Sequence, residues 1–270
     1  MIPPFALVLT AAGSSTRFSK NQKEAVKKEY LRIDGHTVLS SALRPFYSVP
    51  GLRAVVVTCP KGAEDETVVA LEDLVDISSI PLLITEGGMT RKESVENALN
   101  ELRNLVEIPF DYIAIHDGAR PFVTEKLIIS TLAAATITGG AIPALRITDA
   151  VKKLGNDGLI AESVDRSSLI TVQTPQIFLK EQILDAYDKF PGFEADDDAT
   201  LFIKAGYKCT ISKGDPDNKK ITFASDIPDA EAQAEEYIRE RDEGRKSAAA
   251  SRRMRELISM GSDDENRNWE

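Results

Sequence analysis

Short apolar runs alternate with segments of helical spacing along most of this chain. The apolar runs predict strands at Leu7–Leu9, Leu52–Thr58, Leu82–Ile84, Tyr112–His116, Ala141–Ala144 and Cys209–Ser212. The segments of helical spacing predict helices at Val38–Phe46, Glu64–Leu74, Arg91–Arg103, Glu125–Thr138, Lys180–Lys189, Asp197–Ala205 and Pro228–Arg239. This alternation predicts an α/β fold, with a mostly parallel sheet and helices on both of its faces.

One stretch, about residues 146–172, breaks this alternation. Short β-like pieces there flank the turn Gly155-Asn156-Asp157-Gly158, whose chemistry suits a hairpin. We therefore expect a β-arm that projects from the sheet. Beyond about residue 241 the composition shifts to Ser, Ala, Arg and acidic residues. We expect one domain over residues 1–240, which includes the arm, and a frayed helical or disordered tail over 241–270.

Composition excludes several classes of protein. The net charge of −10 argues against a general nucleic-acid binder. No run of 18 apolar residues is present, so we expect no membrane partner. Residues 1–4 lead straight into the first strand, so we expect no signal peptide. Cys59 and Cys209 lack metal-ligand spacing and fit a reducing cytoplasm, and His36 and His116 are too few for a histidine-rich zinc site.

The first candidate site follows the first strand. The run Ala6–Leu9 has the apolar character of a strand buried on both faces, and it breaks into the small residues of Thr10–Thr16. Small residues let backbone N–H groups approach a ligand, and Arg17 and Lys28 add positive charge. This combination favours a polyanion, most simply a nucleoside triphosphate. The loop lacks both the P-loop and the dinucleotide fingerprint. Taken alone, it is equally typical of an ordinary strand-to-helix turn with two solvated basic residues.

A second motif follows the strand Leu82–Ile84. Thr90 and Glu93 form a capping box that starts a helix, and Arg91 and Ser94 lie in its first turn. A plain capped helix explains Thr90 and Glu93. It does not explain the paired glycines Gly87-Gly88, which permit close approach of a ligand.

A third motif, His116-Asp117-Gly118-Ala119-Arg120, comes directly after an apolar strand. Asp117 and Arg120 should therefore lie at the strand's carboxyl end, where open α/β sheets bind their ligands. An acid and a base there can orient a polyol and a phosphate, or a hydrated Mg²⁺. The competing interpretation is a local ion pair that braces a turn. We expect His116 to be structural.

Three later segments carry further candidates. Arg166 is a candidate phosphate ligand, Thr174 lies in Gln173-Thr174-Pro175-Gln176, and Lys220 adjoins a short apolar stretch. Asp196-Asp197-Asp198 has the composition of a metal cluster, but an acidic helix start is the simpler interpretation, because the helix dipole favours acids there.

Taken in order, these motifs resemble one family, 2-C-methyl-D-erythritol 4-phosphate cytidylyltransferase of the non-mevalonate isoprenoid pathway. The ordered set is A-A-G-x-x-x-R, K-x-Y-L, G-G-x-x-R-x-x-S-V, H-D-x-A-R-P, V-D-R, T-P-Q and N-x-K-x-T. It extends from Ala6 to about Glu236. The resemblance implies a Rossmann-like nucleotidyltransferase sheet, CTP and a sugar-alcohol phosphate as substrates, a Mg²⁺ requirement, and a homodimer whose arm completes the partner's site.

The resemblance also assigns roles to residues of this sequence. Arg17 and Lys28 match the catalytic cations on the triphosphate. The residues implied to bind CTP are Ala11, Ala12, Gly13, Gly88, Arg91, Ser94 and Asp117. The residues implied to bind the sugar phosphate are Asp117, Arg120, Arg166, Thr174 and Lys220, with Arg166 given across the dimer. The resemblance implies that Mg²⁺ is bound mainly by the triphosphate and water, and Asp117 is the candidate metal ligand from the protein.

The chain departs from the family pattern at a few positions. Ser15 stands where many members have glycine, Thr16 where some have a second arginine, and Ala150 where threonine is usual, with Thr148 as the neighbouring hydroxyl. The threonine that Ala150 replaces is one that the family places on the sugar phosphate, so this departure bears on the identity of the acceptor. A ribitol 5-phosphate cytidylyltransferase is therefore the nearest competing function. A catalytically inactive assembly module is a second alternative, and a nicotinamide-linked dehydrogenase is disfavoured by the missing fingerprint.

Overall fold

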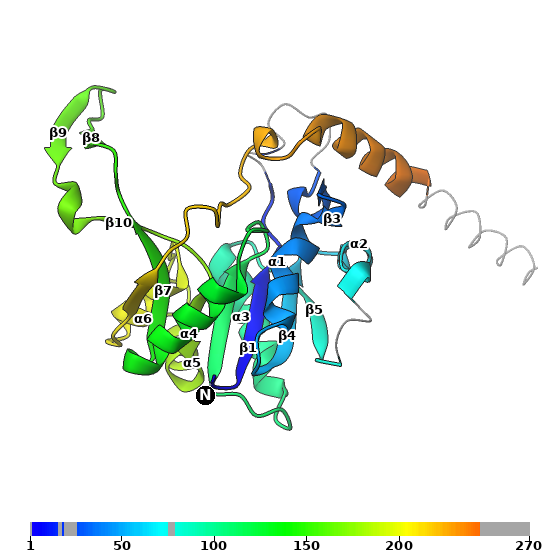
Figure 1. The fold of residues 1–270 in the computed structure, drawn as a ribbon, viewed down its shortest axis with the longest axis horizontal. Coiled ribbons are helices and arrows are strands. Elements are labelled where there is room, and N and C mark those ends of the chain that lie inside the picture. The colour runs from blue at the N-terminus through cyan, green and yellow to red at the C-terminus, as the bar shows by residue number, and fades with distance from the viewer. Residues whose placement is uncertain (1, 16–17, 19–25, 75–78, 244–270) are drawn as a thin grey trace, which may run out of the picture.

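The computed structural model describes residues 2–15, 18, 26–74 and 79–243. Its core is an eight-stranded sheet with the order β10-β7-β11-β6-β1-β4-β5, and β12 pairs with β7 (Figure 1). The strands are β1 (Phe5–Thr10), β4 (Leu52–Cys59), β5 (Leu82–Glu86), β6 (Tyr112–Asp117), β7 (Gly140–Arg146), β10 (Ile170–Val172), β11 (Gln176–Leu179) and β12 (Thr210–Lys213). Strands β1, β4, β5 and β6 run parallel, so their carboxyl ends meet at one edge.

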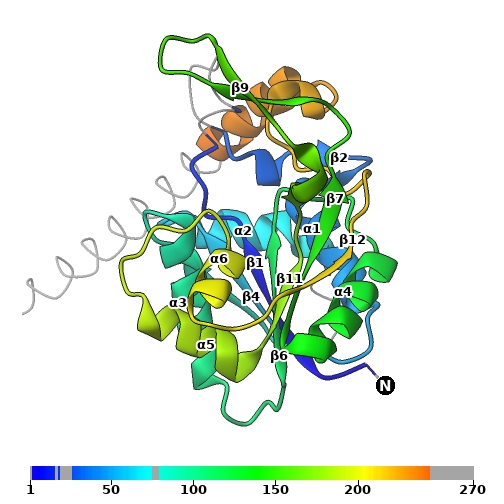
Figure 2. The same cartoon turned by 90° about the vertical axis from the view of Figure 1, so that its left-hand side faces the viewer.

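The helices cover both faces of this sheet. They are α1 (Val38–Tyr47), α2 (Glu64–Ala70), α3 (Arg91–Asn104), α4 (Glu125–Thr138), α5 (Lys180–Lys189) and α6 (Asp198–Lys204). Helices α1, α2 and α4 pack on one face, and α3, α5 and α6 on the other (Figure 2). A further helix occupies residues 230–243. The predicted α/β class, with helices on both faces, is confirmed.

Strand β1 shows why the sheet is buried on both sides. Phe5, Leu7 and Leu9 enter the core beneath α1 and α4, while Ala6 and Val8 enter the core beneath α3. All five are fully buried, as the continuous apolar run predicted. Burial on both faces holds the strand rigidly and delivers its last residue, Thr10, to the carboxyl edge of the sheet.

The sequence prediction missed the small hairpin of β2 (Arg32–Ile33) and β3 (His36–Thr37) and one strand of the central sheet, and it overextended one helix. Strand β11 runs antiparallel between β6 and β7, although its four residues had been left without an element. Helix α2 ends at Ala70, and a 3₁₀ turn over Glu72–Leu74 follows it. A four-residue strand that begins directly after Pro175 carries too short an apolar run to be detected by periodicity.

The predicted β-arm is present. Strands β8 (Val151–Leu154) and β9 (Ile160–Val164) pair antiparallel and project from the sheet, away from the helices (Figure 1). Residues 241–243 continue the last described helix, and residues 244–270 of the predicted tail lie outside the described part of the chain. The division into a domain and a tail stays a prediction. Within the described ranges, no helix has the length and apolar character needed to cross a bilayer.

Candidate active site

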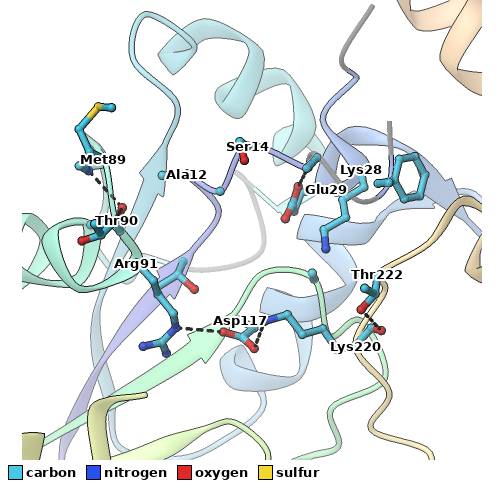
Figure 3. Close-up of a pocket in the computed structure, with 17 residues that line it drawn as sticks. Ala12, Ser14, Lys28, Glu29, Met89, Thr90, Arg91, Asp117, Lys220 and Thr222 are labelled. Atoms are coloured by element: carbon cyan, nitrogen blue, oxygen red, sulfur yellow. Dashed lines mark hydrogen bonds and ion pairs between the residues drawn. The ribbon is translucent and has the colours of Figure 1, made fainter. Parts of the chain in front are cut away.

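A cavity of about 560 Å³ opens at the carboxyl edge of β1 and β6 (Figure 3). Elements far apart in the sequence meet around it: the turn after β1, the 3₁₀ turn η1 (Lys28–Tyr30), the start of α3, the end of β6 and the loop at 220–222. Of the predicted site residues, it is lined by Ala12, Gly13, Lys28, Gly88, Arg91, Ser94, Asp117 and Lys220. The fold therefore gathers most of the candidates in one place.

The turn after β1 forms one wall of the cavity. The N–H of Ala11 donates to the carbonyl and to the hydroxyl of Thr58, at 3.2 and 3.1 Å, which ties the turn to β4. Ala11 itself is buried, so its backbone and not its side chain supports the wall. Ala12 and Gly13 face the cavity. Ser15 adopts a left-handed backbone with φ of 52°.

Lys28 is the described basic residue of the predicted catalytic pair. Its side chain is buried, and its ammonium group donates to the carbonyl of Ile221. Burial lowers the pKa of Lys28, the charge of Glu29 opposes that shift, and the charge of Lys220 adds to it. Arg17, the other predicted catalytic cation, lies outside the described residues. The convergence of Arg17 and Lys28 on one phosphorus therefore stays a prediction.

The double glycine and the capping box shape the opposite wall. Thr90 Oγ1 accepts the N–H of Glu93, and the Glu93 carboxylate accepts the N–H groups of Met89 and Thr90, as predicted. A Cβ on Gly87 would lie 2.2 Å from the Cβ of Ala12. The absence of a side chain at Gly87 therefore lets α3 approach the β1 turn. A plain capped helix has no such requirement at Gly87, so this glycine serves the cavity, whereas Gly88 makes room for Glu93 of the capping box, whose Cβ would lie 2.2 Å from a Cβ there.

Ser94 completes this wall. Its hydroxyl donates to the carbonyl of Thr90 at 2.9 Å and accepts the N–H of Gly88 at 3.1 Å. The hydroxyl thereby holds the Gly88 peptide in place at the rim of the cavity. The backbone of this rim is accordingly fixed before a ligand arrives.

Asp117 is the electrostatic centre of the site. Its carboxylate pairs with Lys220 at 2.9 Å, Arg120 at 3.4 Å and Arg91 at 3.6 Å. Burial by itself would raise the pKa of Asp117, but Lys220, Arg91 and Arg120 together hold that pKa well below its ordinary value. The carboxylate therefore stays ionised and orients three cations, Arg91 and Lys220 at this cavity and Arg120 beside it. Figure 3 shows Arg91 and Lys220 reaching it from opposite sides.

Arg91 is held from behind by a buried acid. Its guanidinium pairs with Asp198 at 2.7 Å, and the hydroxyl of Tyr187 donates to Asp198 at 2.6 Å. Asp197 caps α6 by accepting the N–H of Thr200. The acidic run is thus a helix start, as the simpler interpretation predicted. No group of three or more metal-ligand side chains occurs in the described part of the chain.

His116 and Thr174 support Asp117 from inside the sheet. Thr174 Oγ1 accepts the N–H of Asp117 at 3.1 Å and lies 2.9 Å from Nδ1 of His116. Nε2 of His116 lies 3.3 Å from the carbonyl of Arg120 and donates to it, so the Thr174 hydroxyl donates to Nδ1. Burial lowers the pKa of His116 to about 4, so the ring is neutral. His116 has the structural role expected of it.

A second cavity, of about 730 Å³, adjoins the first. Lys220 and Thr222 line both cavities, and Arg120 lines only the second. Arg166 lies on the arm, where it is exposed and donates to the carbonyl of Thr148. Arg166 is not one of the residues described as lining either cavity. Within one chain the base of the arm, at Thr171 and Val172, lines the second cavity, whereas Arg166 does not reach either one.

Several residues of the cavity were not singled out from the sequence. Glu29, Met89 and Thr222 line it, and Lys27 lies directly behind the β1 turn, where it lines a neighbouring cavity. Lys27 and Glu29 flank Lys28 in the sequence, which is the one signal that points to them. Their burial is a tertiary property and leaves no pattern in the sequence.

The fold and the cavity define an α/β protein whose ligand site lies at the carboxyl edge of a parallel sheet and is surrounded by cations. The family model of 2-C-methyl-D-erythritol 4-phosphate cytidylyltransferase matches residues 5–236. The chain belongs to this family of nucleotidyltransferases, and the resemblance noted from its motifs is confirmed.

Individual relatives agree with this assignment. A 2-C-methyl-D-erythritol 4-phosphate cytidylyltransferase of Caldanaerobacter subterraneus is 34% identical over 83% of this chain and 96% of the relative. Another of that name, from Cereibacter sphaeroides, is 35% identical over 84% and 95%. The solved 4-diphosphocytidyl-2C-methyl-D-erythritol synthase of Anaerococcus prevotii superposes with a TM-score of 0.69 at 27% identity, over 85% of this chain and 95% of that one. The Thermus thermophilus cytidylyltransferase superposes with a TM-score of 0.64 at 29% identity, over 87% and 100%.

Proposed function

We propose that this protein transfers CMP from CTP to 2-C-methyl-D-erythritol 4-phosphate, which gives 4-diphosphocytidyl-2-C-methyl-D-erythritol and pyrophosphate. The observation that carries the proposal is the cavity in which Lys28, Lys220 and the Ala12-Gly13 turn meet, in a chain of this family. The names of its relatives support the same reaction.

The reaction is an in-line displacement at the α-phosphorus of CTP. A phosphate oxygen of the acceptor forms the new P–O bond, and the bond from the α-phosphorus to the oxygen shared with the β-phosphorus breaks. The electron pair of that bond leaves with pyrophosphate. The attacking oxygen is already anionic, so no general base is needed. Lys28, and Arg17 by prediction, would stabilise the negative charge that grows on the α-phosphoryl oxygens.

The first cavity is the proposed CTP site. Backbone groups of Ala12 and Gly13 face it from one side, and Gly88 and Ser94 from the other, which suits a nucleoside held between two close backbone segments. Arg91 reaches this site with its guanidinium tied to Asp198. We infer that Arg91 braces the wall and adds positive charge near the triphosphate.

The second cavity is the proposed acceptor site. It shares Lys220 with the CTP site, and Arg120 lies beside it, so an acceptor phosphate would meet two cations next to the α-phosphorus. Thr174, which accepts the N–H of Asp117, stays a predicted ligand of the sugar phosphate. We propose a homodimer in which the arm carries Arg166 to the acceptor site of the partner, because in its own chain Arg166 lies outside both cavities.

The residues present fit a Mg²⁺ ion bound mainly by substrate. Mg²⁺ commonly keeps several waters and takes one or two carboxylates together with substrate phosphates. Asp117, ionised and at the cavity, is the candidate carboxylate. When bound, the ion would neutralise charge on the triphosphate. We also propose a cytoplasmic location, which the two free thiols, Cys59 and Cys209, support.

The decisive experiment compares acceptors. The purified protein is incubated with CTP, Mg²⁺ and either 2-C-methyl-D-erythritol 4-phosphate or ribitol 5-phosphate, and product mass and pyrophosphate release are followed. We expect turnover with the first acceptor. Preference for ribitol 5-phosphate would replace the proposed acceptor while keeping the CTP site. No turnover, together with no rise in melting temperature on adding CTP and Mg²⁺, would favour an inactive module.

A further inference from the structure

Two hydrogen bonds join the turn after β1 to the segment that carries Lys28, and an ion pair within that segment links their two side chains. The Lys27 ammonium donates to the carbonyl of Gly13 and lies 3.3 Å from a carboxylate oxygen of Glu29. The hydroxyl of Ser15 donates to that same oxygen of Glu29 at 3.4 Å. Residues 13 and 15 are thus bonded to residues 27 and 29, one on each side of Lys28.

This ion pair is out of solvent. The side chains of Lys27 and Glu29 are only 9% and 6% exposed. Burial lowers the pKa of Lys27, and the neighbouring Glu29 carboxylate works against that shift. A buried charge without its partner is strongly unfavourable, so each residue of the pair holds the other in place. The pair is therefore a firm local contact within the 27–29 segment, and it orients the two side chains that bond to Gly13 and Ser15 across to the turn.

The backbone of Ser15 needs the support that this pair provides. Its φ of 52° is in the left-handed region, which residues with a Cβ rarely adopt and glycine adopts freely. A serine there must be held by its surroundings. The contact of its hydroxyl with Glu29 does this, while Lys27 binds the carbonyl two residues earlier. The pair thus compensates for a residue with a Cβ in a left-handed backbone, a conformation that glycine adopts without such support.

We infer that Lys27 and Glu29 are positioning residues that hold the 13–15 turn in its ligand-ready shape and set its distance from Lys28. The inference rests on the proposed function, because the turn is the proposed seat of CTP. It assigns no contact between Lys27 and the nucleotide. Loss of the pair should therefore weaken the binding of CTP and leave the binding of the acceptor unchanged.

A direct contact between Glu29 and the nucleotide is the competing explanation, since Glu29 also lines the cavity. The two explanations differ in what restores binding. If the pair acts through the turn, glycine at position 15 removes the need for it. If Glu29 itself binds the nucleotide, glycine at position 15 restores nothing.

The test uses the double variant Lys27→Met/Glu29→Met, which keeps side-chain length and leaves no unpaired buried charge. We expect a melting temperature close to wild type, a KM for CTP raised about tenfold, and an unchanged KM for the acceptor. Adding Ser15→Gly should return the KM for CTP to within about threefold of wild type. The matched control is Asp185→Met/Lys189→Met, which removes an exposed ion pair on α5 and should change neither KM.

Each other outcome has a definite meaning. A double variant with an unchanged KM for CTP overturns the inference, and so does a loss that Ser15→Gly fails to restore. An inactive wild-type protein refutes the proposed function and not the positioning role. Amide hydrogen exchange of the 11–15 backbone decides the role in that case: it should speed up in the double variant, and unchanged exchange overturns the inference.

Discussion

The two halves of the proposed site are held in very different ways. The CTP side is built on the buried sheet: Ser94 and Asp117 are only 3% and 6% exposed, and each is bonded to a neighbouring element. On the arm, in contrast, Leu154 and Ile160 are 70% and 69% exposed. Exposed apolar residues on one projecting hairpin are typical of a contact with another molecule. The nucleotide side is therefore preorganised within one chain, whereas the proposed acceptor side would gain Arg166 only from the arm of a second chain.

The largest effect is expected on the preorganised side. Lys28→Ala should lower kcat by about 10²–10³, because it removes a fixed cation from the charge that develops on the α-phosphoryl group. Steady-state kinetics at saturating CTP measure this loss. Lys126→Ala, an exposed lysine on α4, serves as the control and should keep full activity. A loss below about tenfold in folded Lys28→Ala would remove Lys28 from the catalytic role.

The next effect probes the arm. Arg166→Ala should lower kcat/KM for the acceptor by about 10–100-fold, the value of one charge-assisted hydrogen bond to a phosphate. The KM for CTP should stay unchanged, since Arg166 lies outside the first cavity. Arg53→Ala, an exposed arginine of β4, is the control.

A mixing experiment sharpens this comparison. If the arm serves the partner's site, a mixed dimer of Arg166→Ala and Lys28→Ala chains contains one site with both residues intact. Unfolding and refolding the two variants together should then recover activity that neither has alone. Lack of recovery, with dimers formed, would place Arg166 in its own chain's site.

A smaller effect concerns the support of Asp117 and appears as pH dependence of stability. The pKa of buried His116 is lowered to about 4, so the unfolded state binds more protons between that pH and about 6.5. The contribution to stability is present above about pH 6.5 and is lost as pH falls toward 4, with a total of about 3 kcal/mol.

Urea unfolding at several pH values measures this dependence. His116→Gln should flatten it across this window. His36→Gln, which changes the other histidine of the chain, should leave it in place. An unchanged slope in His116→Gln would show that another group titrates there.

The smallest effect separates the cavity wall from an ordinary helix cap. Thr90→Ala and Thr124→Ala each remove an N-cap hydroxyl, from α3 and from α4, and each should cost about 1 kcal/mol of unfolding free energy. Of these two threonines, Thr90 alone is among the residues described as lining the proposed CTP cavity. The KM for CTP should therefore rise about twofold in Thr90→Ala and stay unchanged in Thr124→Ala. Steady-state kinetics measure this difference. Equal KM values in the two variants would make the α3 cap purely structural.

Local features of this protein could be predicted from its sequence because neighbouring residues define them. The apolar run of β1 predicted a strand buried on both faces, and Phe5–Leu9 is buried on both. The capping box at Thr90 and Glu93 needs only residues of one helical turn. Asp117 was placed at the carboxyl edge because it ends an apolar strand. These are properties of chain geometry over a few residues.

Only the tertiary structure decided which charges meet. Asp117 pairs with Arg91 and Lys220, which lie far from it in the sequence, and Arg91 is tied to Asp198, 107 residues away. The pairing of Lys27 with the turn at Gly13 likewise depends on burial. Electrostatic energy depends on distance in space and on local burial, and no spacing along the chain encodes either of these. The sequence thus determined the elements and the candidate residues, and the packing of the sheet determined their partners.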